Sequence, residues 1–451
     1  QNKTYSQRRY PTYFGYIMFV ITGLLSSHVA ALELPKSQHD SDFHKFSEEQ
    51  AQLGQLLFYD AILSGNRNIS CGTCHNHAHG SADGLALGVG EGGVGLGPQR
   101  STGSGTDRIL KRIPRNAPGL WNVGAKEYVT FFLDGRVSHA DFYNNRFNTP
   151  AQEWLPQGLN SLLAAQALFP LTSQFEMAGD PGENQVAGAV YDRIDAVWPI
   201  LAKRVRIIPQ YGEMFVTAFA DINKPEQITI SHIANAIAAF EALEWRSTDS
   251  PFDAYLQGQK NALTQAQQRG MTLFYGAADC HQCHSGPLLT DHQFHALGLP
   301  QFGPGRTRQW DMIVRDLGRM SASDRFEDAY RFRTPSLRNV ALTAPYGHNG
   351  AYPTLEGIVR HHLNPQLEFA SWRPEMVDLP VAAWLQKTDF MALEDSRERQ
   401  RVSSTIDIQP QQLQDHQVAD IVAFLNALTG TASVNGRLGK PKHVPSGLEV
   451  D

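Results

Sequence analysis

Two short segments, CGTCH at residues 71–75 and CHQCH at residues 280–284, decide how this chain folds. Each segment holds two cysteines, three positions apart, and a histidine directly after the second cysteine. In a Cys-x-x-Cys-His segment the two thiols form thioethers with a haem, and the adjacent imidazole is positioned to bind the iron. The sequence therefore predicts two covalently attached c-type haems, bound through Cys71, Cys74, His75, Cys280, Cys283 and His284.

Four cysteines also have other uses in proteins. They could form two short-loop disulfides, one zinc site built from both pairs, or two thioredoxin-like redox motifs. Each alternative leaves the repeated histidine without a role, and zinc ribbons usually separate their cysteine pairs by about 15 to 20 residues. The second pair here begins only at Cys280, which favours the haem interpretation.

The segments before the two haem motifs resemble each other. They read EQAQLGQLLFY at 49–59 and QAQQRGMTLFY at 265–275, each with a glycine ahead of a Leu-Phe-Tyr triplet. Both have the apolar spacing of an amphipathic helix, and Ser47 and Thr264 stand where N-cap residues are expected. The repeat indicates a small cytochrome fold used twice.

Two further segments predict long helices. They are ITISHIANAIAAFEALEW at 228–245 and DHQVADIVAFLNAL at 415–428, the second ended by Gly430. The glycine-rich stretch 84–105 has no apolar pattern and is expected to be a mobile loop.

These patterns predict a mainly α fold with long loops and little strand. We expect two cytochrome c-like haem domains, at 40–247 and 255–430, and a loosely ordered tail at 431–451.

The N-terminal residues 1–31 are typical of a cleaved export signal. Basic Lys3, Arg8 and Arg9 precede an apolar run that is short for a membrane span, and small residues follow it. An uncleaved anchor is the alternative. No later stretch is apolar enough to span a membrane, so the mature chain is expected to be exported or periplasmic, without a transmembrane segment.

Removal of residues 1–31 changes the formal net charge from −6 to −9, which argues against nucleic acid as a partner.

Together with the haem motifs, four further motifs resemble the bacterial diheme cytochrome c peroxidase family, which includes MauG-type enzymes. They are RNAP at 115–118, DGR at 134–136, FEM at 175–177 and RTPSLRNVALTAPY at 333–346. In this family, peroxide reacts at the N-terminal haem, and the C-terminal haem relays electrons. The resemblance implies that Glu176 and Gln166 are the acid–base groups that act on peroxide. Without the family, Glu176 would be an ordinary surface carboxylate and Gln166 a polar residue on a helix face.

Resting peroxidases of this family often cap the first iron with a histidine from the loop after the motif. Here the corresponding loop reads GVGEGG at 88–93, and no histidine occurs between His79 and His139. We therefore expect an N-terminal haem that is permanently open. His77 and His79 are expected to face solvent or a haem propionate.

The family places the sixth ligand of the C-terminal haem at a fixed distance after the Thr-x-Pro-Tyr motif, where it is Met in peroxidases or Tyr in MauG-type enzymes. That distance leads to His362, with His361 as the neighbouring alternative. Two histidine ligands would lower the haem potential relative to a methionine ligand.

The resemblance also implies a calcium ion between the haems, held by oxygen ligands. The matching positions are Asn116, Thr343 and Pro345.

In one respect the chain departs from the family: Leu133 stands where an aromatic residue commonly relays electrons between the haems. Trp121 is a candidate replacement because it lies close to the RNAP motif in the sequence.

We expect a peroxidase-type oxidoreductase that reacts with hydrogen peroxide and draws electrons from a small redox donor protein. One alternative is the MauG-like oxidation of a Trp or Tyr side chain of a partner protein. Another is a non-catalytic diheme electron carrier.

Overall fold

The structure is a computed structural model that describes residues 33–143, 145–306, 314–431, 434 and 436–451. The predicted export signal at 1–31 lies outside these residues. All described helices and strands belong to residues 34–451, which form one compact unit. Within the described residues, we find no helix with the length and apolar character that crossing a membrane requires.

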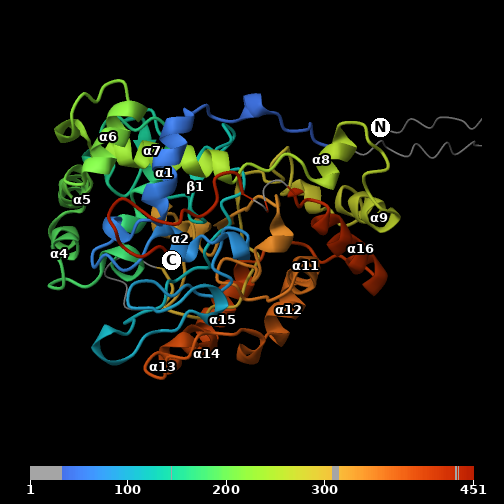
Figure 1. The fold of residues 1–451 in the computed structure, drawn as a ribbon. Coiled ribbons are helices and arrows are strands. Elements are labelled where there is room, and N and C mark those ends of the chain that lie inside the picture. The colour runs from blue at the N-terminus through green and yellow to red at the C-terminus, as the bar shows by residue number, and fades with distance from the viewer. Residues whose placement is uncertain (1–32, 144, 307–313, 432–433, 435) are drawn as a thin grey trace, which may run out of the picture. The chain divides into compact units, whose positions relative to one another are not determined.

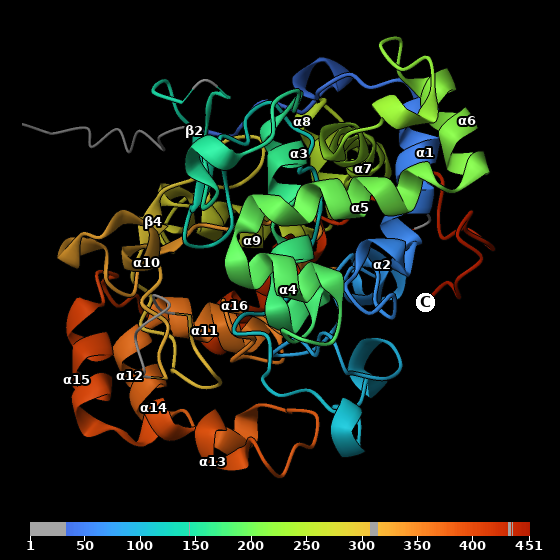
Figure 2. The ribbon, with the colours of Figure 1, turned by 90° about the vertical axis from the view of Figure 1, so that its left-hand side faces the viewer.

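Helices dominate the structure and the strands are short, which confirms the mainly α fold (Figures 1 and 2). The helices are α1 (Glu48–Tyr59), α2 (Cys71–Cys74), α3 (Leu162–Ala167), α4 (Gln185–Asp192), α5 (Val197–Arg206), α6 (Pro209–Ala218), α7 (Ile230–Glu244), α8 (Pro251–Leu256), α9 (Gln265–Phe274), α10 (Met320–Ser323), α11 (Leu355–Leu363), α12 (Pro365–Ser371), α13 (Gln386–Asp389), α14 (Met391–Glu394), α15 (Ser396–Thr405) and α16 (Asp415–Asn426). Strands β1 (Thr130–Phe131), β2 (Val137–His139) and β3 (Phe147–Asn148) form one antiparallel sheet, and β4 (Phe294–His295) pairs with β5 (Phe332–Arg333).

The helices before the two haem motifs begin at the residues that the sequence predicts. The hydroxyl of Ser47 accepts a hydrogen bond from the backbone N–H of Gln50 at 3.1 Å. The hydroxyl of Thr264 accepts one from the backbone N–H of Gln267 at 3.3 Å. Each hydroxyl satisfies an N–H group that has no partner within its helix.

The two halves repeat one packing arrangement, in which α1 lies against α7 and α9 lies against α16 (Figures 1 and 2). A Cβ atom at Gly54 of α1 would overlap the carbonyl oxygen of Ala236 in α7. A Cβ atom at Gly270 of α9 would overlap the carbonyl oxygen of Asp420 in α16 in the same way. Only glycine permits so close an approach of two backbones, which explains why the repeated segments share it.

The glycine-rich stretch 84–105 differs from the expected mobile loop. It folds around the side chain of Arg100, which is 4% exposed. The guanidinium donates hydrogen bonds to the carbonyl oxygens of Val89 (2.6 Å), Gly90 (2.8 Å) and Gly95 (2.7 Å). Because a buried cation needs such acceptors, the loop takes one defined path.

The C-terminal residues 436–451 also differ from the expected loosely ordered tail. Their trace passes across α1 and α2 in Figure 1 and runs beside these helices in Figure 2, and Val444 is buried in the core that α1 and α7 share. The buried carboxylate of Glu244 accepts hydrogen bonds from the backbone N–H groups of Arg437 (3.1 Å), Leu438 (2.6 Å) and Gly439 (3.0 Å). We call residues 436–451 the C-terminal strap.

Candidate haem and peroxide sites

The first haem motif is held by a hydrogen bond that orients its histidine. Cys71 and Cys74 begin and end α2, and His75 follows directly. The Nδ1 atom of His75 lies 2.8 Å from the carbonyl oxygen of Ser81. Because a carbonyl oxygen only accepts, Nδ1 carries the proton and Nε2 keeps the lone pair that binds a metal. Burial lowers the pKa of His75 and so favours the neutral ring.

The second haem motif has the same arrangement. Cys280 begins a short 3-10 helix, and the Nδ1 atom of His284 lies 3.1 Å from the carbonyl oxygen of Leu289. Burial, and then the neighbouring His362, lower the pKa of His284 to about 4. None of the four cysteines forms a disulfide. Free thiols and two oriented, neutral imidazoles fit two covalently attached haems.

A second histidine faces His284. The side chain of His362, on α11, has its ring centroid 6.1 Å from that of His284. Two imidazoles that bind one metal ion from opposite sides at about 2 Å have ring centres roughly 6 Å apart. The Nδ1 atom of His362 lies 2.8 Å from the carbonyl oxygen of Ile358, so its Nε2 atom is the one left for a metal.

The neighbouring His361 uses both of its ring nitrogens within the protein. It is fully buried, and its Nε2 donates to the carbonyl oxygen of Leu297 at 2.8 Å. Its Nδ1 accepts from the hydroxyl of Tyr352 at 2.8 Å. Burial, the main cause, lowers the pKa of His361 to about 3. No nitrogen of this side chain remains for a metal ion.

Glu176 lies in a π-helical turn, Gln174–Ala178, beside the first haem motif. Burial raises the pKa of Glu176, and the charges of Arg136 and Arg306 oppose this effect. Burial, Asp83 and Glu176 in turn raise the pKa of the Cys74 thiol. The carboxyl group is therefore close enough to the first motif for its charge to act there.

The glycine-rich loop packs directly on this turn. The backbone N–H of Glu91 donates to the carbonyl oxygens of Phe175 (3.3 Å) and Glu176 (3.1 Å). The carboxylate of Glu91 accepts from the side-chain amides of Asn66 (2.9 Å) and Asn68 (2.8 Å). The loop 88–93, which contains no histidine, is thus fixed beside Glu176.

Gln166 is half-buried on α3, and its carbonyl oxygen accepts from the backbone N–H of Phe169 at 3.1 Å. The turn Pro170–Thr172 then leads to the turn of Glu176, against which it packs. In the described chain, no hydrogen bond joins the side chains of Gln166 and Glu176. The structure therefore brings the two residues onto neighbouring elements without a direct bond.

A buried charge cluster around Asp134 could not be found from the sequence. Asp134 is 1% exposed and accepts from Arg115 at 2.8 Å, Arg136 at 2.9 Å and Arg306 at 3.2 Å. Burial raises the pKa of Asp134, but the three guanidinium groups outweigh it and hold that pKa well below its usual range. The DGR motif was a weak signal for this cluster, and Arg306 carried none, because it lies far along the chain.

The residues suggested for calcium lie on two neighbouring segments. The backbone N–H of Asn116 donates to the carbonyl oxygen of His348 at 2.9 Å, and its side-chain amide donates to that of Leu85 at 2.6 Å. Thr343 and Pro345 belong to the segment that leads to His348, and Thr343 bonds to the carbonyl oxygen of Val340. Calcium at these residues stays a prediction.

Within the described residues, one group of side chains of the kinds that bind metal ions lies close together, namely Cys283, Asp291 and His295. It belongs to the second haem motif, where Cys283 is the predicted thioether. His77 and His79 are both half-buried, and their predicted positions near solvent or a haem propionate stay a prediction. His77 lies 3.1 Å from Glu244, and His79 lies against the glycine-rich loop.

The two residues considered for electron relay lie in different surroundings. The carbonyl oxygen of Leu133 accepts from the backbone N–H of Arg333 at 2.8 Å, which joins the two halves. Trp121 is 4% exposed and packs edge-on against Trp245, with ring centroids 5.5 Å apart. Its ring therefore lies at the end of α7.

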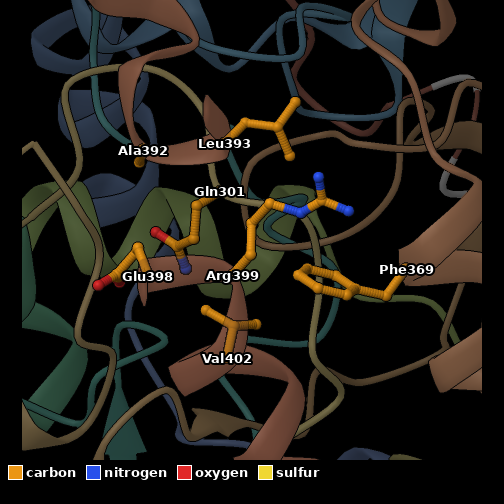
Figure 3. Close-up of a pocket in the computed structure, with 7 residues that line it drawn as sticks. All are labelled: Gln301, Phe369, Ala392, Leu393, Glu398, Arg399 and Val402. Carbon is orange, nitrogen blue, oxygen red and sulfur yellow. The ribbon is translucent and has the colours of Figure 1, made fainter. Parts of the chain in front are cut away.

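A small pocket lies in the C-terminal half (Figure 3). It is lined by Gln301, Phe369, Ala392, Leu393, Glu398, Arg399 and Val402. The carboxylate of Glu398 already accepts from the hydroxyl of Tyr330 at 2.6 Å, and the side-chain oxygen of Gln301 accepts from the backbone N–H of Asp316 at 2.8 Å. Since these polar groups stabilise the fold, we assign the pocket no part in the haem sites.

Known proteins resemble this chain over most of its length. Residues 48–261 match the model of the family described as di-haem cytochrome c peroxidase. The cytochrome c551 peroxidase of Pseudomonas aeruginosa is 31% identical over 324 residues, which are 71% of this chain and 73% of the relative. The methylamine utilization protein MauG of Methylorubrum extorquens is 28% identical over 352 residues, which are 76% of this chain and 78% of the relative.

A solved structure supports the same relationship. It is a MauG-like protein associated with microbial copper homeostasis, 27% identical, with a TM-score of 0.55 over 90% of this chain and 96% of the other. The identity to the P. aeruginosa relative and the share of both chains that it covers show the family. The chain therefore belongs to the di-haem cytochrome c peroxidase family, a family of peroxidase-type oxidoreductases that carry two haems.

Proposed function

We propose that this protein reduces hydrogen peroxide at the haem of His75 and receives the electrons through the haem of His284. The observation that carries this proposal is the difference between the two histidines. His284 faces a second imidazole, that of His362, at 6.1 Å. Within the described residues, the only aromatic ring that contacts His75 is that of Phe58, at 6.4 Å. One haem would then have two protein ligands and the other a side open to peroxide.

The residues beside the open side support proton transfer. When bound, the haem supplies an iron at which peroxide can be reduced. The Glu176 carboxylate would take a proton from one oxygen of peroxide and give it to the other as the O–O bond breaks. Burial raises the pKa of Glu176 while Arg136 and Arg306 lower it, and these opposing effects suit a group that both accepts and releases a proton. Gln166 would orient the peroxide through its amide.

The electrons would come from a small redox protein outside the chain. Each peroxide takes up two electrons and two protons and yields two water molecules. The proposed location is the periplasm or another exported compartment, in keeping with the sequence of residues 1–31. Nothing in the charge of the chain favours nucleic acid as a partner.

The spin state of the ferric protein tests the proposal against a plain diheme electron carrier. We expect one low-spin haem, with two histidine ligands, and one high-spin haem in electron paramagnetic resonance spectra. A spectrum that is low-spin throughout would identify a carrier without a peroxide site.

The substitution Glu176→Gln tests the proton-transfer role. We expect the rate of reaction with peroxide to fall by about 10²–10⁴-fold, the usual contribution of a general acid–base group, with both haems still attached. The measurement is a stopped-flow absorbance trace after mixing with peroxide. Glu153→Gln is the matched control, because Glu153 is exposed in the short turn Gln152–Trp154. An unchanged rate in Glu176→Gln would remove Glu176 from the mechanism.

A second candidate function is MauG-like oxidation of a Trp or Tyr side chain on a partner protein. The observation that favours it is the fixed loop 88–93, which has no capping histidine and hence no reductive opening step. The two functions differ in the reductant. Turnover of peroxide with a small reduced cytochrome or copper protein supports the first, and peroxide-dependent modification of a partner side chain without that donor supports the second.

A further inference from the structure

The two halves differ at one matched position on the helices that pack beside the haem motifs. Phe240 of α7 and Phe424 of α16 occupy equivalent places against the glycines of α1 and α9. The next residue is Glu241 in the first half and Leu425 in the second. Both are 5% exposed. A carboxyl group in one half therefore stands where the other half has an apolar side chain.

Glu241 is buried without a full set of hydrogen bonds. Its Oε2 atom has no hydrogen-bonding partner among the described residues. Burying a carboxyl group in this way opposes folding, and a leucine, as at position 425, avoids that cost. The side chain of Glu241 therefore does not stabilise the fold of the N-terminal half.

The helix directs Glu241 toward the first haem motif. Trp245 follows it by four residues and so lies on the same face of α7, one turn further on. The ring of Trp245 lies 4.2 Å from that of His77, centroid to centroid. His77 comes two residues after the haem-binding His75. The face of α7 that carries Glu241 is therefore the face that lies along this motif.

The start of the motif lies next to the same turn of α7. The ring of Phe240 lies 6.1 Å from that of Tyr59, and a Cβ atom at Gly72 would overlap the Tyr59 ring. Burial, followed by the charge of Glu241, raises the pKa of the Cys71 thiol. Glu241 thus lies beside the cysteine at which the haem is attached.

Among the described residues, burial is the one influence on the pKa of Glu241, and no positive group lowers it. On its own helix, Glu244 is bound by His77 and the backbone N–H groups of the C-terminal strap. On α1, burial keeps Tyr59 protonated by raising its pKa. Cys71 is a thioether once the haem is attached and then does not titrate. Burial alone raises the pKa of Glu241 to about 8.

We propose that Glu241 makes the reduction potential of the N-terminal haem depend on pH. The inference rests on the part of the proposed function that attaches a haem to Cys71 and Cys74, and it does not require a reaction with peroxide. Glu241 takes up one proton from solvent when one electron, from an external one-electron reductant, reaches this haem. Above the pH at which Glu241 ionises, its negative charge opposes the added electron and lowers the potential.

The experiment is a spectroelectrochemical titration of both haems in the holoprotein between about pH 6 and pH 10, a range that brackets the pKa of about 8 to which burial raises Glu241. In the unmodified protein, we expect the potential of the N-terminal haem to fall as the pH rises. In Glu241→Gln this fall should become smaller, because Asp83 and Glu176 still act at the first haem motif, and the potential above pH 8 should be higher than in the unmodified protein. The C-terminal haem should keep its potential. The same pH dependence in Glu241→Gln and in the unmodified protein would overturn the proposal.

The repeat supplies reciprocal variants. Glu241→Leu copies the second half and should behave like Glu241→Gln, whereas Leu425→Glu should add a pH dependence to the C-terminal haem. Glu213→Gln, on the exposed side of α6, is the control and should change neither potential. If Leu425→Glu does not fold, the two substitutions of Glu241 still decide the question.

The outcomes separate this inference from the proposed function. A mass that corresponds to fewer than two attached haems would contradict both. Two haems with an unaltered potential in Glu241→Gln would contradict the inference alone. A shifted potential in a protein that does not react with peroxide would contradict the proposed function alone.

Discussion

At the scale of single residues, hydrogen bonds to ring nitrogens decide which histidines can bind a metal. His75 and His284 each use Nδ1 on a backbone carbonyl and keep Nε2. His362 does the same with the carbonyl of Ile358. His361, its neighbour, uses both nitrogens. Two adjacent imidazoles on one helix thus have different chemistry because only one has a free lone pair.

The substitution His362→Met tests this assignment. A thioether ligand favours the ferrous state more than imidazole does, so we expect the potential of the C-terminal haem to rise while that of the N-terminal haem stays unchanged. Spectroelectrochemical titration measures both.

The control for this prediction is His361→Gln, which should keep the low-spin spectrum. It should cost about 1–3 kcal/mol of unfolding free energy, since it leaves buried hydrogen-bonding groups unpaired. If His361→Gln lost the low-spin signal and His362→Met kept its potential, the ligand would be His361.

At the scale of secondary structure elements, one glycine per half sets how closely the helix before the haem motif approaches its partner. Gly54 faces the backbone of α7, and Gly270 faces that of α16. A methyl group at either position would have to push two helices apart. Since Phe58 and Phe274, on the same helices, lie next to His75 and His284, that displacement would reach both haem sites.

Alanine substitutions test this packing. We expect Gly54→Ala and Gly270→Ala each to lower the free energy of unfolding by about 1–3 kcal/mol, the usual cost of overpacking. Chemical denaturation followed by absorbance in the haem region measures the change.

Gly188, within α4, has no atom within 4 Å of the position that a Cβ would take. Gly188→Ala is therefore the control, and it should stabilise the protein by about 0.5–1 kcal/mol because alanine favours a helix interior. Equal effects at Gly54 and Gly188 would show that the close approach does not matter.

At the scale of the whole molecule, the C-terminal strap stabilises the first half through contacts with residues far away in the sequence. The C-terminal strap follows the closing helix of the second half but contacts the first. Its backbone N–H groups surround the carboxylate of Glu244, the hydroxyl of Ser446 donates to Asp60 at 2.7 Å, and Asp451 bonds to Thr73 within the first haem motif. These contacts join the C-terminal strap to the first half.

Ending the chain before Gly436 should uncover Glu244 and leave its charge without the N–H groups that bind it. Hydrogen bonds to a charged group typically contribute about 1.5–3 kcal/mol. We expect a loss of this size in the free energy of unfolding, together with faster proteolysis within α1 and α2. Lys442→Ala, at an exposed position of the strap, should change neither. Unaltered stability of the shortened chain would show that the strap contacts contribute nothing.

The sequence alone determined the cofactor chemistry, the helical class and the repeat. Cys-x-x-Cys-His segments, helical periodicity and N-cap residues act over a few neighbouring positions, so their consequences can be predicted without the fold. The pairing of helices around Gly54 and Gly270 could be expected from the repeat, but not their close approach.

Only the tertiary structure decided which distant groups meet. The Asp134 cluster joins residues from both halves, Glu244 binds the C-terminal strap, and Arg100 orders a glycine-rich stretch that has no apolar pattern. Each depends on burying a charge beside partners far away in the chain, and the free energy of such a contact depends on the surroundings rather than on local sequence. His361 lies beside His362 in the sequence, so the sequence alone could not exclude it as a ligand. The fold excludes it, because its two ring nitrogens bond to Tyr352 and to the carbonyl oxygen of Leu297.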